Sequence, residues 1–181
     1  MLLGLVFLLS ITGCRKDTPA DTDSSILTTA PELTVKTSDQ TIAATQGTTS
    51  WRYHVEGDTW SGFEADSVHP LDGSIREIIP KLYYDALSTI SHMKPNDADL
   101  IFDPAPDSVT VRCWDEIYWG KPEDDDKAES VPCEGPDFHI ELKDSGYIYE
   151  VIANWNCTPE YNGTAGYFFY AAPATPENTP Q

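Results

Sequence analysis

Basic residues are scarce in this sequence, which has 11 Lys and Arg against 30 Asp and Glu and a formal net charge of −19 at pH 7. Binding to DNA or RNA requires a basic surface that neutralises phosphates, so we expect no nucleic-acid partner. Anionic lipid headgroups would also repel most of the chain, and only Arg15 and Lys16 are placed to attract them. This acidity affects solubility and association rather than the fold.

Motifs typical of several catalytic and metal-binding proteins are also missing. The sequence has no H-E-x-x-H of zinc peptidases and no G-x-S-x-G, and the acidic run Glu123–Asp126 lacks the EF-hand pattern with its glycine. We interpret this run as an exposed loop. The histidines show no spacing of metal ligands, and they are His54, His69, His92 and His139. We therefore expect neither a metal site nor a cofactor.

No apolar run approaches the ~20 residues of a membrane-spanning helix, but a shorter run begins the chain. Leu2 to Leu9 is almost wholly apolar and is followed by Ile11-Thr12-Gly13-Cys14. These four residues resemble a bacterial lipobox, in which the cysteine receives a diacylglyceryl group and everything before it is removed. The resemblance implies that residues 1–13 are a lipoprotein signal peptide and that Cys14 is lipidated. Signal peptides usually begin with basic residues, and this one has none.

A lipidated Cys14 would anchor the protein at the extracytoplasmic face of the cell membrane. Acyl chains contribute ~0.8 kcal/mol for each buried CH₂, and more than one chain holds a protein firmly. Residues 14–32 are rich in Thr, Ser, Asp and Pro, which favours a flexible tether. Residues 33–171 are sufficient for one domain, and residues 172–181 are predicted to be a disordered Pro/Thr tail.

Apolar and polar residues alternate with a period of two through much of residues 33–171, which predicts β-strands. The alternating segments are residues 51–55, 109–113, 138–142 and 147–155, and residues 163–172 resemble a last strand. Turn-forming segments such as GDTWSG separate the runs. Apolar spacing between Leu82 and Ile90 instead predicts a short helix. We predict an all-β fold, an immunoglobulin-like antiparallel β-sandwich with one short helical insertion, in which Tyr149 acts as a tyrosine corner and Trp155 as the packed aromatic.

A hairpin is predicted around the turn Lys143–Gly146. The register that opposes apolar residues at every step pairs Leu142 with Tyr147, Ile140 with Tyr149 and Phe138 with Val151. It also places His139 opposite Glu150 on the outer face.

The same register suggests a disulfide. Spacing alone cannot choose among the pairs that Cys113, Cys133 and Cys157 allow. Extending the two hairpin strands brings Cys133 and Cys157 nearly opposite each other, within the distance that a disulfide spans, and such a pair can oxidise outside the cell. Cys113 lies on the inward stripe and is expected to remain a free, buried thiol.

Aromatic residues suggest where a ligand would bind. Five Trp and nine Tyr are present, and we expect most of them in the core. Trp114, Tyr118 and Trp119 instead lie among acidic residues at a strand end. They could form a platform for a protein or a glycan, and the alternative is burial under the loop.

Several segments resemble a family of uncharacterised lipoproteins from Firmicutes and the outer domain of some metallopeptidase-type, β-lactam-sensing membrane regulators. The resemblance covers most of Ile42 to Tyr170 and rests on Gly47–Trp51, Ala65–Leu71, Pro106–Trp114, Tyr118–Gly120 and Gly146–Trp155. The usual Gly-Thr-Tyr-Ser-Trp has Thr49 here in place of its Tyr. The family has no established activity, so the resemblance implies a sensing role only by analogy.

Together these features favour a membrane-anchored lipoprotein that acts as a non-catalytic binding or sensing module. The alternative is an extracellular hydrolase that uses Ser67 and His69, with Asp66 beside them. Nucleophilic catalysis requires the nucleophile and its base to be in hydrogen-bond contact. The sequence leaves open the ligand, the oligomeric state and the oxidation state of the three remaining cysteines.

Overall fold

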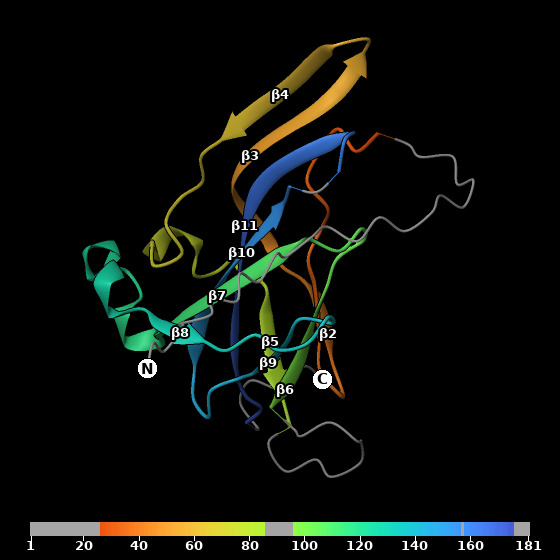
Figure 1. Cartoon of the computed structure of the whole chain (residues 1–181). Helices are drawn as coiled ribbons and strands as arrows, with labels where there is room; N and C mark the ends of the chain where they lie inside the picture. Colours follow the sequence, from red (N-terminus) through yellow and green to blue (C-terminus); the bar gives the residue numbers. More distant parts are fainter. Residues whose placement is uncertain (1–25, 86–95, 157, 176–181) are drawn as a thin grey trace, which may run out of the picture.

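The computed structural model describes residues 26–85, 96–156 and 158–175, and almost all of its regular structure is β-strand (Figure 1). The strands are β1 (Thr34–Lys36), β2 (Thr41–Ala43), β3 (Thr45–Glu56), β4 (Thr59–Ala65), β5 (Lys81–Tyr84), β6 (Asp97–Ile101), β7 (Ser108–Asp115), β8 (Glu129–Val131), β9 (His139–Glu141), β10 (Tyr147–Trp155) and β11 (Tyr161–Pro173). Three short 3₁₀ helices are η1 (Gly73–Ile75), η2 (Glu116–Tyr118) and η3 (Pro122–Lys127).

These strands form two sheets. The larger has seven strands, in the order β4-β3-β11-β10-β7-β8 with β5 beside β11, and the smaller has four, in the order β2-β1-β6-β9. Every pairing is antiparallel except that of β5 with β11. The predicted all-β antiparallel sandwich is therefore confirmed, and the immunoglobulin-like assignment stays a prediction.

The main core lies between the two sheets. The odd-numbered residues of β10 from Tyr149 to Trp155 are fully buried and pack in one cluster with side chains of the small sheet, such as Val35, Leu100 and Ile140. Burying each such apolar side chain stabilises the fold by roughly 1.5–3 kcal/mol. The alternation in the sequence thus marks which face of β10 points inward.

A second apolar cluster covers the opposite face of the large sheet. Trp114, Ile148 and Phe168 point away from the small sheet and pack against Leu71 and Ile75 of the segment around η1. Residues 165–172 of β11 are therefore buried on both faces. This explains why that strand is a continuous apolar run rather than an alternating one.

Tyr149 and Trp155 are both buried, and each makes a hydrogen bond to the backbone. The Tyr149 hydroxyl accepts a hydrogen bond from the Lys143 backbone N–H at 2.7 Å, six residues upstream, as in a tyrosine corner. The Trp155 indole N–H donates to the Pro104 carbonyl at 3.1 Å, and its ring meets the Trp51 ring edge-on at 5.4 Å.

The predicted hairpin register is wrong. β9 pairs with β6 in the small sheet, whereas β10 pairs with β7 and β11 in the large one. His139 consequently lies opposite Asp99, and Glu150 lies opposite Arg112. Alternation identifies the buried face of a strand but not the strand with which it pairs. The segment 142–146 connects the small sheet to the large one and does not form a hairpin turn within a single sheet.

The predicted helix is wrong where the structure describes it. Residues Lys81–Tyr84 form β5, which runs parallel to Tyr170–Pro173 of β11. Leu82 and Tyr84 are buried in the main core as strand residues. The remaining part of the predicted helix, residues 86–90, lies outside the described residues.

The cysteine predictions have different outcomes. Cys113 is a free, fully buried thiol, as expected, and burial raises its pKa to about 12. Cys133 is a half-buried free thiol, and its predicted partner Cys157 lies outside the described residues. The register that motivated their pairing is the one found to be wrong.

Residues 1–25 and 176–181, which include the lipobox with Cys14 and most of the tether and tail, also lie outside the described part.

Candidate functional site

The three aromatics of the predicted platform are buried or half-buried. Trp114 is fully buried, since it points to the face of β7 that the second apolar cluster covers. Its indole N–H donates to the Asp125 carbonyl at 3.2 Å, and the Arg112 guanidinium carbon lies 4.7 Å from the ring centre. Trp114 therefore cannot contact a ligand.

Tyr118 and Trp119 are half-buried beside this cluster. The Trp119 ring stacks on Tyr170 at 5.3 Å, and the Arg76 guanidinium covers it at 5.2 Å. The Trp119 indole nitrogen is buried and has no hydrogen-bond partner among the described residues. Burial under the loop, the alternative considered above, thus accounts for Trp114 and for much of the other two rings.

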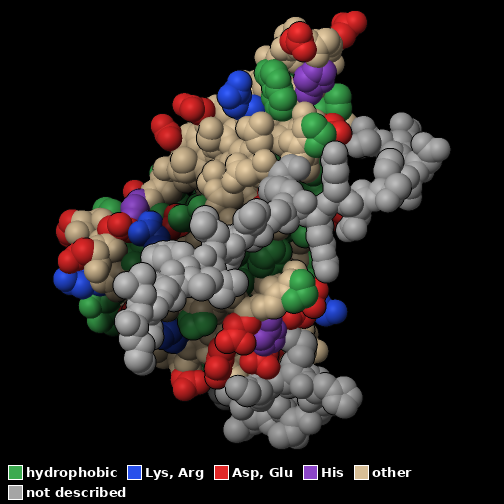
Figure 2. Space-filling view, viewed as in Figure 1, with side chains coloured by type: hydrophobic (Ala, Val, Ile, Leu, Met, Phe, Trp, Pro, Cys, Tyr) green, Lys and Arg blue, Asp and Glu red, His purple; other side chains and the backbone are tan. Residues whose placement is uncertain are grey.

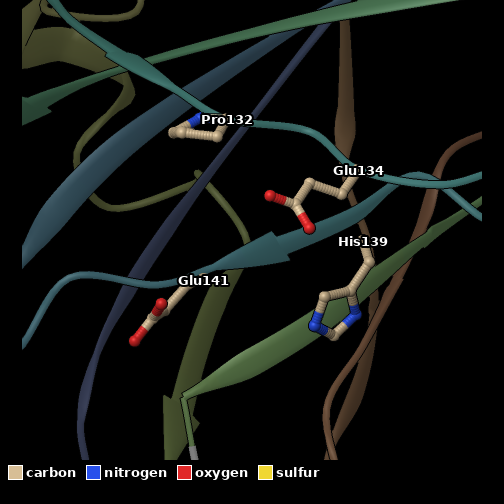
Figure 3. Close-up of a pocket in the computed structure, with 4 residues that line it drawn as sticks. All are labelled: Pro132, Glu134, His139 and Glu141. Carbon is tan, nitrogen blue, oxygen red and sulfur yellow. The ribbon is translucent and has the colours of Figure 1, made fainter.

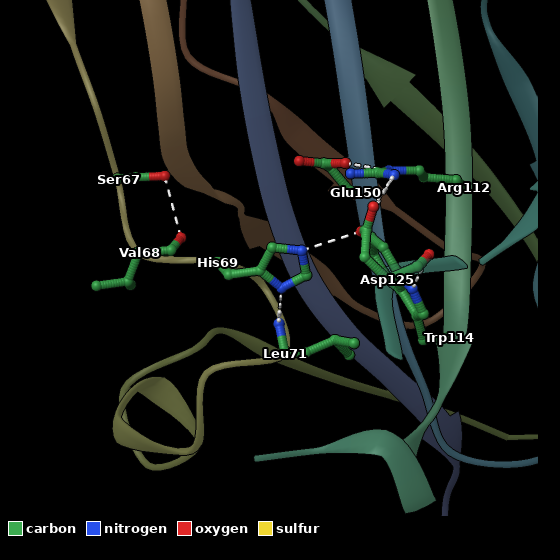
Figure 4. A network of polar contacts seen from close by, with 8 residues as sticks. All are labelled: Ser67, Val68, His69, Leu71, Arg112, Trp114, Asp125 and Glu150. Carbon is green, nitrogen blue, oxygen red and sulfur yellow. Dashed lines mark hydrogen bonds and ion pairs between the residues drawn. The ribbon is translucent and has the colours of Figure 1, made fainter. Parts of the chain in front are cut away.

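Ser67 and His69 do not form a catalytic pair (Figure 4). The Ser67 hydroxyl donates to the Val68 carbonyl at 3.2 Å. The Nδ1 atom of His69 accepts the Leu71 N–H at 3.1 Å, and its Nε2 lies 3.0 Å from the Asp125 carboxylate. Both ring nitrogens are occupied, so neither can take a proton from Ser67.

Asp125 is not simply part of an exposed loop, because it anchors η3 to the large sheet. Its carboxylate lies 3.2 Å from the Arg112 guanidinium, which also binds Glu150 at 2.5 Å on the neighbouring strand β10. Together with the His69 contact, this network joins β7, β10, η3 and the segment that contains His69 (Figure 4). Its role is structural, since each charged group already has a partner.

A second histidine lies in a hollow at the edge of the small sheet (Figure 3). This hollow of about 330 Å³ is lined by Pro132, Glu134, His139 and Glu141. The imidazole of His139 lies 3.0 Å from Asp99 and 3.5 Å from Asp97, and the hydrogen bond to Asp99 is the main cause of its raised pKa. Within the described residues, no group of three His, Cys, Asp or Glu side chains is arranged to hold a metal ion.

The hairpin of β3 and β4 projects beyond the rest of the large sheet (Figure 1). β4 lies at one edge of the large sheet, and all seven of its residues are exposed. Three large apolar side chains of the hairpin are exposed, Val55 by 52 %, Trp60 by 38 % and Phe63 by 38 %. Figure 2 shows apolar, basic, acidic and histidine side chains gathered on this projection.

Strand alternation places Trp60, Gly62 and Glu64 on one face of β4, next to Arg52 of β3. Gly62 lies opposite Arg52, and a Cβ at this position would be 3.0 Å from the Arg52 Cγ and 2.5 Å from the Trp51 carbonyl oxygen. The absence of a side chain at Gly62 therefore leaves room for Arg52 to lie over β4.

The Arg52 guanidinium carbon is 5.9 Å from the centre of the Trp60 ring. Across the described chain, neither Arg52 nor Glu64 makes an ion pair or a side-chain hydrogen bond. A hollow of about 430 Å³ lies beside these side chains. It is lined by Ser50, Trp51, Arg52, Trp60, Ser61, Gly62, Phe63 and Glu64. The site thus combines an aromatic ring with an unpaired cation and an unpaired anion.

The sequence interpretation missed this hairpin because GDTWSG was taken as a turn. Only the first residues of that segment turn the chain, and Thr59 already begins β4. The available signal was the pair of large aromatics, Trp60 and Phe63, directly after a Gly-Asp turn.

No protein-family model, curated protein or solved structure matches this chain. The resemblance to the Firmicutes lipoproteins and to the outer domain of the membrane regulators stays a prediction. No helix in the described ranges is both long and apolar enough to cross a bilayer.

Proposed function

We propose that this protein is a non-catalytic binding module that is held at the extracytoplasmic face of the membrane through Cys14 and binds its ligand with the β3–β4 hairpin. The observation that carries this proposal is the free edge of β4, exposed along its whole length. An unpaired edge strand presents a row of backbone N–H and C=O groups to any chain that can pair with it.

The composition of β4 supports this role. Edge strands are normally protected by Lys, by Pro, or by a covering helix or loop. The β4 segment TWSGFEA contains neither Lys nor Pro, and its exposure shows that no described segment covers it. It instead carries exposed aromatics, which are common at the centres of protein interfaces. The hydrolase alternative has no such support, because Ser67 and His69 are engaged elsewhere.

Site-specific photo-crosslinking in cells tests the proposal. A photoreactive p-benzoylphenylalanine replaces Trp60 in the full chain, and in a control chain it replaces Ile78, which is 75 % exposed in a different segment. We expect a crosslinked product of higher mass from position 60 and none from position 78. The absence of any product from position 60 would contradict the use of the hairpin as the binding surface.

A further inference from the structure

We propose that the partner of the β4 edge is a second copy of this chain, paired β4 to β4 around a twofold axis at Gly62. This inference rests on the proposed function of the hairpin and names its partner. It follows from three features of the edge, which are its backbone polarity, its symmetry and its unpaired charges.

The backbone groups that are free at the edge belong to Trp60, Gly62 and Glu64. The His54 N–H donates to the Glu160 carbonyl at 2.8 Å, so even-numbered residues of β3 face β11 and odd-numbered residues face β4. On β4, Phe63 lies opposite Trp51 and Ser61 lies opposite Tyr53. The backbone groups of Phe63 and Ser61 are therefore hydrogen-bonded to β3. The even-numbered residues Trp60, Gly62 and Glu64 therefore direct their N–H and C=O groups outward.

These outward groups match a second copy of themselves. When Gly62 lies opposite Gly62 of the second copy, Trp60 lies opposite Glu64 of that copy, and the reverse holds on the other side. Each outward residue then faces an outward residue, and the full strand Thr59–Ala65 is paired. A shift by one residue would oppose outward and inward groups and would lose the bonds. The arrangement is isologous, as in most homodimers.

The unpaired charges also match. Arg52 lies over Gly62 with its guanidinium beside Trp60 and makes no ion pair with any described residue. Twofold pairing brings Glu64 of the second copy opposite Trp60 and hence next to Arg52. The reciprocal pair forms across the axis, so each copy supplies the anion that the other lacks. A foreign partner would have to place an acid opposite Trp60 and a separate cation within reach of Glu64.

The small interface and the high net charge determine the protein and salt concentrations at which the dimer should be tested. An edge of seven residues is small for a protein interface, so we expect a weak, reversible dimer. The charge of −19 on each copy opposes association at low salt, and about 0.15 M salt screens repulsion beyond roughly 8 Å.

A charge swap tests the dimer directly. Full-length chains carry Cys14→Ser, so that no lipid contributes, and sedimentation velocity is followed across a concentration series at about 0.15 M salt. We expect Arg52→Glu and Glu64→Arg each to weaken dimerisation about tenfold, because each change breaks two symmetric contacts between close charges. The double variant Arg52→Glu/Glu64→Arg should restore it. Glu77→Arg, an exposed change of the same charge outside the hairpin, should leave it unaltered.

A chain that stays monomeric at every concentration, or a double variant that stays as weak as the single ones, would overturn the proposal. Both substituted side chains are exposed, so circular dichroism should show the same fold in every variant. The crosslinking above separates the two proposals. A product of twice the chain mass from position 60 supports the dimer, whereas a product with another molecule supports the binding function and rules out self-association at this edge.

Discussion

At the residue scale, the hairpin and the core meet at Trp51. This side chain is fully buried between β3 and the main core, stacks on Tyr161 at 5.5 Å and lies opposite Gly163 of β11. A Cβ on Gly163 would lie 2.3 Å from the Ser50 carbonyl oxygen and 2.6 Å from the Trp51 ring. Neither neighbour is the free end of a flexible side chain, so glycine is required there for steric reasons.

We therefore expect Gly163→Ala to lower the free energy of unfolding by about 1–3 kcal/mol, the usual cost of overpacking. Urea denaturation monitored by tryptophan fluorescence measures it. Gly166→Ala on the same strand is the control, because its Cβ would be 3.4 Å from the nearest atom. Equal effects of the two substitutions would contradict this account.

At the scale of the element, β9 shows how a three-residue strand is held at a sheet edge. Its strand partner is β6, and His139 contacts Asp99 and Asp97 across that pairing. The backbone of His139 also forms an isolated bridge with Glu134. The pKa of His139 is raised above its ordinary value near 6.5, chiefly by its hydrogen bond to Asp99. The protonated form therefore stabilises the folded state. That contribution is complete below the unfolded pKa and is lost as the pH rises through the folded pKa.

We expect the native chain to lose stability between about pH 6 and pH 8 relative to His139→Gln, since that variant lacks the titrating group. Melting temperatures of both proteins over this range measure the difference. Asp99→Asn should remove most of the same pH dependence while leaving the histidine in place. A pH dependence that is the same in all three proteins would show that this contact does not contribute.

The same strand shows the limit of sequence patterns at this scale. Alternation correctly predicted that Ile140 and Tyr149 are both buried. It could not show that they lie on different sheets, because an apolar face is satisfied equally by a neighbouring strand and by a facing sheet.

At the scale of the whole molecule, the described domain begins its first strand at Thr34 and ends its last at Pro173. The proposed anchor lies at Cys14, twenty positions before that first strand. We expect Cys14→Ser to release the protein into the medium or to leave its leader uncleaved, because the thiol is the acceptor of the lipid. Fractionation of cells and blotting would measure this. A variant that is correctly cleaved and still bound to the membrane would contradict the lipoprotein proposal.

The sequence by itself determined the fold class and the inward faces of the long strands, because side-chain direction alternates along any strand and burial must follow it. The same reasoning predicted Cys113 as a free, buried thiol. Only the tertiary structure decided which strands are neighbours, and hence that Trp114 is covered while Trp60 is exposed. Both tryptophans lie in strands of the large sheet. Their exposure depends on which segments, distant in sequence, pack against each face of the sheet. The residues around η1 and η3 cover Trp114, whereas no described segment covers Trp60.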